Sequence, residues 1–509
     1  MKNRSQTILL YLLPSLGAIL WLSAFIGVLT KGGQMINSDG DLGRHITVGN
    51  YILDTRTIPL QDVFSHTMSG APLTPHEWLS EVLFALSNRL MGLNGAILLS
   101  ALVIATALWL VYVRSSQGRK TFFPLLLVGA LTLLTSSIHW LARPHIFTFL
   151  LLALWVIVLE QMKKGKTRLW WLLPLLMLAW VNLHGAFIAG FATWLLYALG
   201  LVWDKLWFKS EESEPLPDKF WRRYLLGGVT ALPATLVNPS GLGLWKTSVG
   251  YVANKFLVDR TVEYQAPDFH DQSFWPFLIF IILLVMVIGL RDKKTRAEWL
   301  IPSAAWLAMA LYSGRNIPLF VIVSAPLLAE GLEDLVYRYS AQHKLLGRIL
   351  RHDENLFAIN STINGILWPI VFVVIAVIGL RAGIKFDKEQ LGNAYDPAEF
   401  PVEAVNWLEE NPQQGEMFNY FTWGGYLLYR EWPEMNVFID GQTDFYGEEL
   451  SREYLEVLAL DPGWEDVLAK YSVDWVLLPV DELAARTLQQ KADWTVVYKD
   501  DTAVIVHRK

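Results

Sequence analysis

Residues 8–49 read ILLYLLPSLGAILWLSAFIGVLTKGGQMINSDGDLGRHITVG, and this stretch decides the fold. Its first part, residues 8–29, is apolar and uncharged, and about 20 such residues span the hydrocarbon core of a bilayer as a helix. The run exceeds the roughly 7–15 apolar residues of a signal peptide, and no small-x-small cleavage pattern precedes Lys31. Asp39 and Asp41 follow soon after the run. The stretch therefore predicts a membrane-spanning helix that delivers a polar segment to the membrane surface.

Further apolar runs follow before residue 382. They lie near residues 94–113, 121–139, 146–160, 169–182, 186–207, 224–237, 273–290, 297–313, 317–334 and 364–381. Several are short for a full span, which predicts tilted, broken or re-entrant helices. Of the 509 residues, 53% are hydrophobic and 18% are charged, against about 45–50% and about 25% in ordinary soluble domains. The runs and the composition predict a polytopic α-helical membrane protein with about 11 spans.

The composition also excludes several classes of protein. The apolar content and the net charge of -6 argue against a disordered chain and against nucleic-acid binding, so no nucleic-acid partner is expected. The absence of cysteine excludes a disulfide framework and a cysteine-based zinc site.

Basic residues mark every second connection between the apolar runs. Lys2 and Arg4 precede the first run, and the later basic segments are Arg114–Lys120, Lys163–Arg168, Lys205–Arg223, Arg291–Arg296 and Arg338–Arg351. Because cytoplasmic loops carry the excess of Lys and Arg, we expect these connections and the N-terminus in the cytoplasm. With an odd number of spans, the C-terminal region is then extracytoplasmic. The expected location is a bacterial inner membrane.

Charge also divides the chain into two parts near Arg381. Residues 382–509 carry 25 acidic and 10 basic residues, whereas residues 1–381 carry 23 acidic and 32 basic ones. We therefore expect a membrane domain over residues 1–381 and a water-soluble, three-layer α/β domain over residues 382–509. Local patterns in the second domain predict helices at 401–410, 448–460 and 482–490, strands at 435–440 and 473–478, and a closing hairpin over 494–506.

The long connection formed by residues 30–93 concentrates titratable side chains near the membrane surface. Apolar residues recur at helical spacing around 42–53 and 78–86, which predicts two helices lying in the interface. An Asp-x-Asp pair such as Asp39 and Asp41 is common in solvated turns, so the pair alone is weak evidence for a functional site. The same loop also contains Arg44, His45, His66, His76, Glu77 and Glu81. So many ionisable groups beside a lipid interface favour a polar ligand there.

Other connections add cations and a few acids to the same side of the membrane. These residues are His139, Arg143, His145, Asn182, His184, Arg315 and Asn316, and, in loop 238–272, Lys246, Lys255, Asp259, Arg260, Glu263, Asp268, His270 and Asp271. For any one of them, an interfacial hydrogen bond is the simpler interpretation. Together they suit a lipid-linked phosphate, which Arg and Lys hold by charge-assisted hydrogen bonds while a carboxylate deprotonates an incoming hydroxyl. Two carboxylates could instead bind a divalent metal that stabilises the leaving group.

These features resemble the GT-C superfamily of membrane glycosyltransferases, in particular bacterial relatives of protein mannosyltransferases and aminoarabinose transferases. The resemblance rests on the acidic motif in the long loop 30–93 and on the segments Ser38–Gly49, Ile58–Ser65, His76–Glu81, Phe418–Tyr426 and Val437–Asp444. It implies an enzyme that transfers a hexosyl or pentosyl group, with inversion, from a polyprenyl-phosphate donor. The implied partners are membrane lipid, this donor, and a glycan, lipid or protein acceptor on the extracytoplasmic face.

The resemblance also implies roles for individual residues. Asp39 or Asp41 takes the place of the catalytic acid, and the candidates for binding the donor phosphate or substrate are Arg44, His45, His76, Glu77, Arg143, His145, His184, Lys255, Arg260 and Arg315. GT-C enzymes often supply a second carboxylate from the loop between the third and fourth spans, and this chain has none there. A cofactor such as Mg²⁺ or Mn²⁺ on Asp39 and Asp41 is therefore one alternative. The other is a metal-free mechanism, or one that uses Asp259, Glu263 or Glu77.

Two other classes of function remain as alternatives to the enzyme. One is a transporter or flippase of lipid-linked glycans, and the other is a non-catalytic factor in envelope assembly. Paired repeats and ionisable residues at mid-span are typical of transporters, and neither pattern is evident in the sequence. The pattern of charge therefore favours the transferase.

Overall fold

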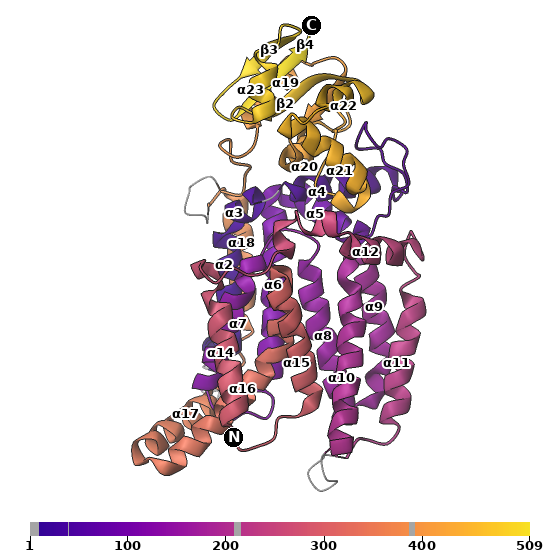
Figure 1. Cartoon of the computed structure of the whole chain (residues 1–509). Coiled ribbons are helices and arrows are strands. Elements are labelled where there is room, and N and C mark those ends of the chain that lie inside the picture. The colour runs from indigo at the N-terminus through magenta and orange to yellow at the C-terminus, as the bar shows by residue number, and fades with distance from the viewer. Residues whose placement is uncertain (1–9, 39, 208–214, 386–391) are drawn as a thin grey trace.

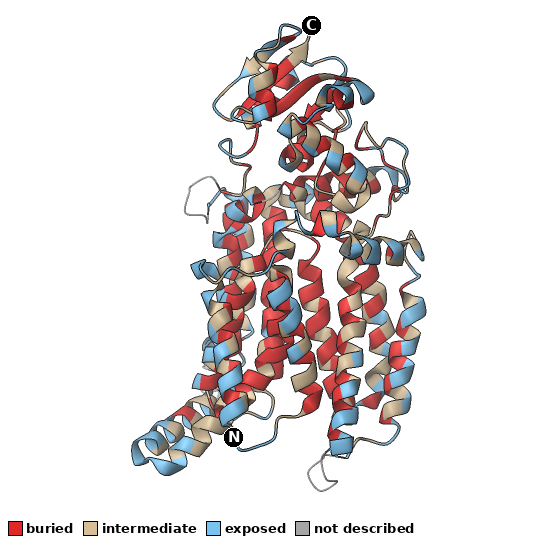
Figure 2. Ribbon diagram, in the orientation of Figure 1, coloured by how far each residue is buried: buried red, intermediate tan, exposed pale blue. Residues whose placement is uncertain are grey.

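The computed structural model describes residues 10–38, 40–207, 215–385 and 392–509. A bundle of long helices makes up most of the chain, and the C-terminal domain covers one end of the bundle (Figure 1). Each apolar run predicted from the sequence falls on a helix of the bundle: α2 (Leu16–Thr30), α6 (Leu93–Ser116), α7 (Phe123–Ser136), α8 (Ile146–Lys163), α9 (Leu172–Leu183), α10 (Ile188–Trp207), α11 (Phe220–Ala234), α14 (Trp275–Leu290), α15 (Ala297–Tyr312), α16 (Ile317–Gln342) and α18 (Leu367–Arg381). Buried residues line the helix faces that meet inside the bundle (Figure 2).

Helix length and hydropathy identify the parts of the bundle that can cross a membrane. Within the described ranges, 5 helical stretches are long and apolar enough: Leu10–Thr30, Leu93–Ser116, Ile146–Lys163, Gly185–Trp207 and Gln272–Leu290. The pair of α17 (Lys344–Thr362) and α18, bent by 65°, makes up to 6 if it forms a single span. The prediction of a helical membrane protein is confirmed, but the expected count of about 11 spans is not.

Two basic connections lie at the end of the bundle opposite the C-terminal domain. Arg119 pairs with Glu333 at 3.0 Å, and Arg291 pairs with Asp334 at 2.6 Å. Both acids belong to the last turns of α16, which leads into α17 at that end of the molecule (Figure 1). If this basic end faces the cytoplasm, as the distribution of Lys and Arg predicts, the C-terminal domain lies on the other side.

Loop 30–93 folds into short helices at the end of the bundle that the C-terminal domain covers. These helices are α3 (Gly32–Asn37), α4 (Asp41–Thr55) and α5 (Trp78–Met91). Helices α4 and α5 pack closely because Gly49 has no side chain: a Cβ at this position would overlap the backbone carbonyl of Glu81. The two helices predicted around 42–53 and 78–86 correspond to α4 and α5.

The C-terminal domain is built on a four-stranded mixed sheet. The strands are β1 (Glu416–Asn419), β2 (Val473–Pro479), β3 (Trp494–Lys499) and β4 (Ala503–Arg508), in the order β1-β2-β4-β3. Strands β1 and β2 are parallel, and the other two pairs are antiparallel. The surrounding helices are α19 (Val402–Glu410), α20 (Gly424–Glu431), α21 (Thr443–Ala459), α22 (Trp464–Lys470) and α23 (Leu483–Leu488). The strand predicted at 473–478 and the closing hairpin are present.

The strand predicted at residues 435–440 is wrong, since this segment joins no strand of the sheet. The side chain of Asn419, at the end of β1, binds its backbone instead: Asn419 Oδ1 accepts a hydrogen bond from the Phe438 N–H (2.8 Å), and Asn419 Nδ2 donates to the Ile439 carbonyl (2.9 Å). Because an asparagine side chain offers both an acceptor and a donor, it takes the place of a neighbouring strand here. Strand β1, which is short, was not predicted.

The same segment anchors loop 30–93 to the C-terminal domain. Val437 forms an isolated parallel bridge with Ser65, with the Val437 N–H donating to the Phe64 carbonyl at 3.1 Å. The Thr67 hydroxyl donates to the Phe438 carbonyl at 2.6 Å. Loop 30–93 is therefore held between the helix bundle on one side and the C-terminal domain on the other.

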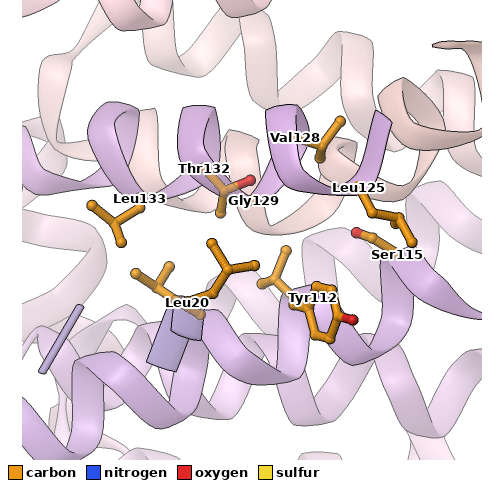
Figure 3. A pocket seen from close by; sticks show the side chains of 10 residues that line it. Leu20, Tyr112, Ser115, Leu125, Val128, Gly129, Thr132 and Leu133 are labelled. Carbon is orange, nitrogen blue, oxygen red and sulfur yellow. The ribbon is translucent and has the colours of Figure 1, made fainter. Parts of the chain in front are cut away.

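A small cavity inside the bundle lies between α2, α6 and α7 and is lined mostly by apolar side chains such as Leu20 and Val128 (Figure 3). Its volume of about 10 Å³ is close to that of one water molecule. The hydroxyls of Ser115 and Thr132 border it, and neither has a hydrogen-bond partner among the described residues. A cavity of this size does not accommodate a substrate.

The contact between α4 and α20 can be tested with Gly43→Ala. A Cβ on Gly43 would overlap the Gly425 carbonyl of α20. We expect a loss of about 1–3 kcal/mol of stability from this overlap, which exceeds the gain of up to about 1 kcal/mol from replacing glycine in a helix. The control is Gly289→Ala in α14, where no atom lies within 4 Å of the added Cβ. Thermal unfolding of the purified protein in detergent should show a lower midpoint for Gly43→Ala than for the control, and equal midpoints would contradict this packing.

The orientation in the membrane can be tested with single cysteines, because the natural chain has none. The side chain of His270, on the side of the C-terminal domain, is 99% exposed, and that of Lys293, at the basic end, is 74% exposed. A membrane-impermeant maleimide should label His270→Cys in intact spheroplasts. It should label Lys293→Cys only after the membrane is permeabilised. The reverse pattern would place the C-terminal domain in the cytoplasm.

Candidate active site

Polar side chains from distant parts of the sequence meet where the helix bundle touches the C-terminal domain. They come from the start of α4, the residues that lead into α5, the connection between η1 (Ser137–His139) and α8, the break between α9 and η3 (Gly185–Phe187), η4 (Val262–Tyr264), and the loop 440–444 that leads into α21. Ion pairs and hydrogen bonds connect these segments, as described below. The cluster therefore depends on contacts between the two domains.

Arg143 lies between two carboxylates. Its guanidinium is 2.5 Å from Asp41 Oδ2 and 2.6 Å from Glu263 Oε1. Asp41 is the first residue of α4, where the helix dipole favours a negative charge. Burial raises the pKa of Glu263, but the positive charge of Arg143 outweighs burial and lowers this pKa to about 2. Loop 238–272 thus supplies a second carboxylate, which the connection between the third and fourth spans lacks.

The C-terminal domain lies directly against Asp41. A Cβ on Gly441 would overlap the Asp41 carboxylate, so only glycine lets the backbone come this close. The side chain of Asp41 remains 15% exposed, which leaves it accessible. Asp39, the other member of the predicted acidic pair, lies outside the described residues.

Arg44 joins α4, α5 and the C-terminal domain. Its Nε donates to Asp440 Oδ2 at 3.2 Å, and its Nη1 is 3.4 Å from Glu81 Oε1. Its Nη2 donates to the side-chain oxygen of Gln442. Burial lowers the pKa of Arg44, but Asp440 and Glu81 raise it above its ordinary value, so the guanidinium stays charged. Arg44 was predicted to bind phosphate or substrate, and the structure places it in a buried contact between the domains.

Glu77, the residue before α5, faces three histidines. Its Oε1 is 3.5 Å from His184 Nε2 and 3.8 Å from His76 Nε2, and its Oε2 is 3.9 Å from His45 Nδ1. His45 Nδ1 is also 3.4 Å from Glu81 Oε1. Four of the residues predicted for the site, Glu77 and the three histidines, are therefore brought together by the fold.

His76 also contacts the C-terminal domain, with its Nδ1 3.7 Å from Asp444 Oδ2 and 3.1 Å from the carbonyl oxygen of Thr74. Burial lowers the pKa of His76, but the carboxylates of Asp444 and Glu77 outweigh burial and raise it above its ordinary value. These carboxylates therefore favour the protonated form of His76 beside Glu77.

His145 and His184 are buried beneath this layer. The ring centroids of His145 and His139 are 4.4 Å apart, and His184 Nδ1 lies 2.8 Å from the Thr148 hydroxyl. Burial lowers the pKa of both His145 and His184 well below the ordinary value. Both imidazoles are therefore neutral at physiological pH and suit hydrogen bonding rather than charge neutralisation.

Three predicted residues lie away from the centre of the cluster. Arg315 stacks on Tyr264, with its guanidinium carbon 4.4 Å from the ring centroid, and so lies beside Glu263. Lys255 and Arg260 line a separate groove against the C-terminal domain. The structure does not bring these two cations to Asp41.

The C-terminal domain contributes side chains that the sequence analysis did not assign to the site. Asp440, Gln442 and Asp444 contact Arg44 and His76, as described above. The segment Val437–Asp444 was singled out as a motif, but none of its residues was predicted to belong to the site. Nothing along the chain indicates that residues near 440 lie against residues near 41.

The described part of the site does not fit a metal ion. Among the described residues, no group of three or more His, Asp or Glu side chains is arranged to hold one. The carboxylate of Asp41, the predicted ligand that the structure shows, is bound by Arg143 instead.

Comparison with known proteins places the fold. No family model and no curated protein matches the chain. Among solved structures, it is similar to the oligosaccharyltransferase AglB from Archaeoglobus fulgidus in complex with an inhibitory peptide and a dolichol-phosphate (TM-score 0.56, 12% identity, 91% of this chain and 69% of that chain). The apo form of the A. fulgidus oligosaccharyltransferase gives a TM-score of 0.55 at 12% identity, with the same coverage of 91% and 69%.

ArnT from Cupriavidus metallidurans bound to undecaprenyl phosphate gives a TM-score of 0.48 at 13% identity and covers 96% of this chain and 97% of that chain. At such low identity the two oligosaccharyltransferase structures show a shared fold and no more. At that level the structure agrees with the resemblance predicted from the sequence: the chain shares the fold of these oligosaccharyltransferase structures.

Proposed function

We propose that this chain is a membrane glycosyltransferase. It moves a sugar from a polyprenyl-phosphate-linked donor to a glycan, lipid or protein acceptor on the extracytoplasmic face of a bacterial inner membrane. The observation that carries the proposal is the group of Asp41, Arg143 and Glu263, held at the end of a bundle with the GT-C fold. The AglB structure contains a dolichol-phosphate, which belongs to the proposed class of donor lipid.

Arg143 is the proposed ligand of the donor phosphate. A guanidinium binds two phosphate oxygens with parallel hydrogen bonds, and here it is already oriented by Asp41 and Glu263. Because Glu263 has a pKa of about 2, it stays ionised and keeps holding Arg143 throughout the physiological range. Arg143 can then stabilise the negative charge that grows on the phosphate as it leaves.

Asp41 is the proposed general base. The acceptor hydroxyl attacks the anomeric carbon of the donor sugar, its proton passes to Asp41, and the bond between the anomeric carbon and the phosphate oxygen breaks. The polyprenyl phosphate leaves with that electron pair, and attack from the opposite side inverts the anomeric centre. Glu263 is too weakly basic for this role, and Asp259 is exposed in the separate groove. Glu77 faces three histidines and suits the positioning of the second substrate.

A flippase is the rival function. It needs a polar path from one face of the membrane to the other. The cluster around Asp41 and Glu77 instead lies at one end of the bundle, under the C-terminal domain. This position favours chemistry at the membrane surface over transport across it.

Asp41→Asn should abolish most of the transfer while leaving the fold intact. Removing a general base typically lowers a rate by about 10²–10⁴-fold, so we expect at least a 100-fold loss in kcat. The measurement is the consumption of a radiolabelled polyprenyl-phosphate sugar by membranes that contain the variant, with the products separated by chromatography. The control is Asp271→Asn, an exposed acid on the same side whose capping hydrogen bond to the Ser273 N–H an asparagine can also make.

Transfer by Asp41→Asn at the parental rate would rule out Asp41 as the base. If the parent moves the labelled lipid between leaflets without losing its sugar, the flippase would be the correct function instead.

Arg143→Gln should destabilise the protein in a manner that depends on pH. The parent holds the pKa of Glu263 at about 2, below its ordinary value of 4.5, because Arg143 outweighs burial. This lowered pKa stabilises the parent above pH 4.5, and the contribution is lost as the pH falls toward 2. Without Arg143 the contribution disappears. The difference in thermal midpoint between parent and variant should therefore be large at pH 7 and should shrink steadily below pH 4.5.

The control for this measurement is Arg89→Gln. Arg89 pairs with Asp54 at 2.6 Å, but both side chains are well exposed, so their interaction is weak and screened. The thermal midpoint of Arg89→Gln should match that of the parent at every pH. A constant difference between Arg143→Gln and the parent from pH 7 to pH 3 would show that Arg143 does not act through the charge of Glu263.

A further inference from the structure

A groove of about 620 Å³ lies between loop 238–272 and the C-terminal domain. One wall is formed by the end of α12 (Gly243–Ala253) and by α13 (Lys255–Val258), and the other wall by α21. Its volume falls within the roughly 300–1,000 Å³ of small-molecule sites. The lining residues are Ala253, Asn254, Lys255, Phe256, Asp259, Arg260, Glu448 and Arg452.

Two guanidinium groups stack on an aromatic ring in this groove, and a third cation lines it. The guanidinium carbons of Arg260 and Arg452 each lie 3.9 Å from the centroid of the Phe256 ring, and Lys255 is the neighbouring residue in the sequence. Stacking on the ring restrains both guanidinium groups, so less conformational entropy is lost when they bind an anion.

The two carboxylates of the groove do not neutralise all of this positive charge. Glu448 accepts a hydrogen bond from Arg452 Nε at 2.8 Å. Among the described residues, neither Lys255 nor Arg260 forms an ion pair. The second carboxylate of the groove is Asp259. Two exposed cations are therefore available to a ligand.

The groove is connected to the candidate active site through the start of α21. Asn254 Nδ2 donates to Glu448 Oε2 at 3.2 Å, and the Thr443 hydroxyl donates to the Tyr251 hydroxyl at 3.1 Å. The residue after Thr443 is Asp444, which lies 3.7 Å from His76 in the cluster. Glu448 follows Asp444 by four residues, across a kink at Gly447, so the groove and the cluster are joined by a short stretch of chain.

We propose that this groove binds an anionic group, a phosphate or carboxylate, on the acceptor. The inference rests on the proposed transferase function, in which the donor phosphate is held by Arg143. The groove is a second cationic site, none of whose residues pairs with Asp41 or Arg143, and two of its eight lining residues, Glu448 and Arg452, belong to the C-terminal domain. It therefore suits the second substrate, and it favours acceptors that carry a negative charge.

The test measures binding to the purified full-length protein in nanodiscs of phosphatidylcholine. N-acetylglucosamine 1-phosphate is the probe and N-acetylglucosamine its neutral match, and saturation-transfer NMR follows both. The parent should bind the phosphate preferentially. The double variant Lys255→Gln/Arg260→Gln should bind it at least about tenfold more weakly, because two charge-assisted hydrogen bonds are lost. Both side chains are exposed, so the thermal midpoint should not change.

Two controls separate this proposal from nonspecific charge effects and from the transferase proposal. Lys246→Gln removes an exposed cation of α12 that does not line the groove. This variant should bind the probe as tightly as the parent does. Asp41→Asn should also bind it normally, since the base is not part of the groove. In a transfer assay, the double variant should raise KM for the acceptor while kcat is retained.

Equal binding of the phosphate and the neutral sugar by the parent would overturn the proposal, as would parental affinity in the double variant. A third result would also overturn it. If the double variant loses affinity for phosphatidylglycerol in nanodiscs but not for the sugar phosphate, the groove binds bilayer headgroups rather than an acceptor.

Discussion

The structure depends on keeping one charged side chain, Arg44, buried between the helix bundle and the C-terminal domain. Removing a guanidinium from water costs several kcal/mol unless carboxylates and hydrogen bonds replace the solvent. Glu81 supplies one partner from α5, whereas Asp440 and Gln442 supply the others only while the C-terminal domain rests on α4. This requirement places the loop 440–444 over the end of the bundle, and with it Gly441 against Asp41.

The position of this loop explains why the site belongs to both domains. The bundle contributes Arg143, and loop 30–93 contributes Asp41 and Glu77 at the end of the bundle. The C-terminal domain adds Asp444 and one wall of the cationic groove. In the proposed reaction the lipid donor approaches from the membrane and the charged acceptor approaches from the aqueous side. These two routes suit substrates of very different solubility.

Hydropathy patterns predicted the helices and strands correctly where burial of those same residues forms the element. Apolar runs became helices of the bundle, and the alternating residues at 494–506 became the β3–β4 hairpin. The prediction failed at 435–440, where β-type residues are bound by the side chain of Asn419 and by loop 30–93 rather than by a strand. Such a partner does not show in the segment's own sequence.

The sequence by itself determined the apolar helices of the bundle and the separate, less apolar C-terminal domain, because hydropathy and charge act locally along the chain. It also identified Asp41, Glu77, Arg143 and the histidines as chemically interesting. Only the tertiary structure decided which of them meet. Arg44 and Asp440 are 396 residues apart, and their pairing follows from packing and from the cost of burying charge, which involve the whole fold at once. For the same reason, Lys255 and Arg260 lie in a groove of their own.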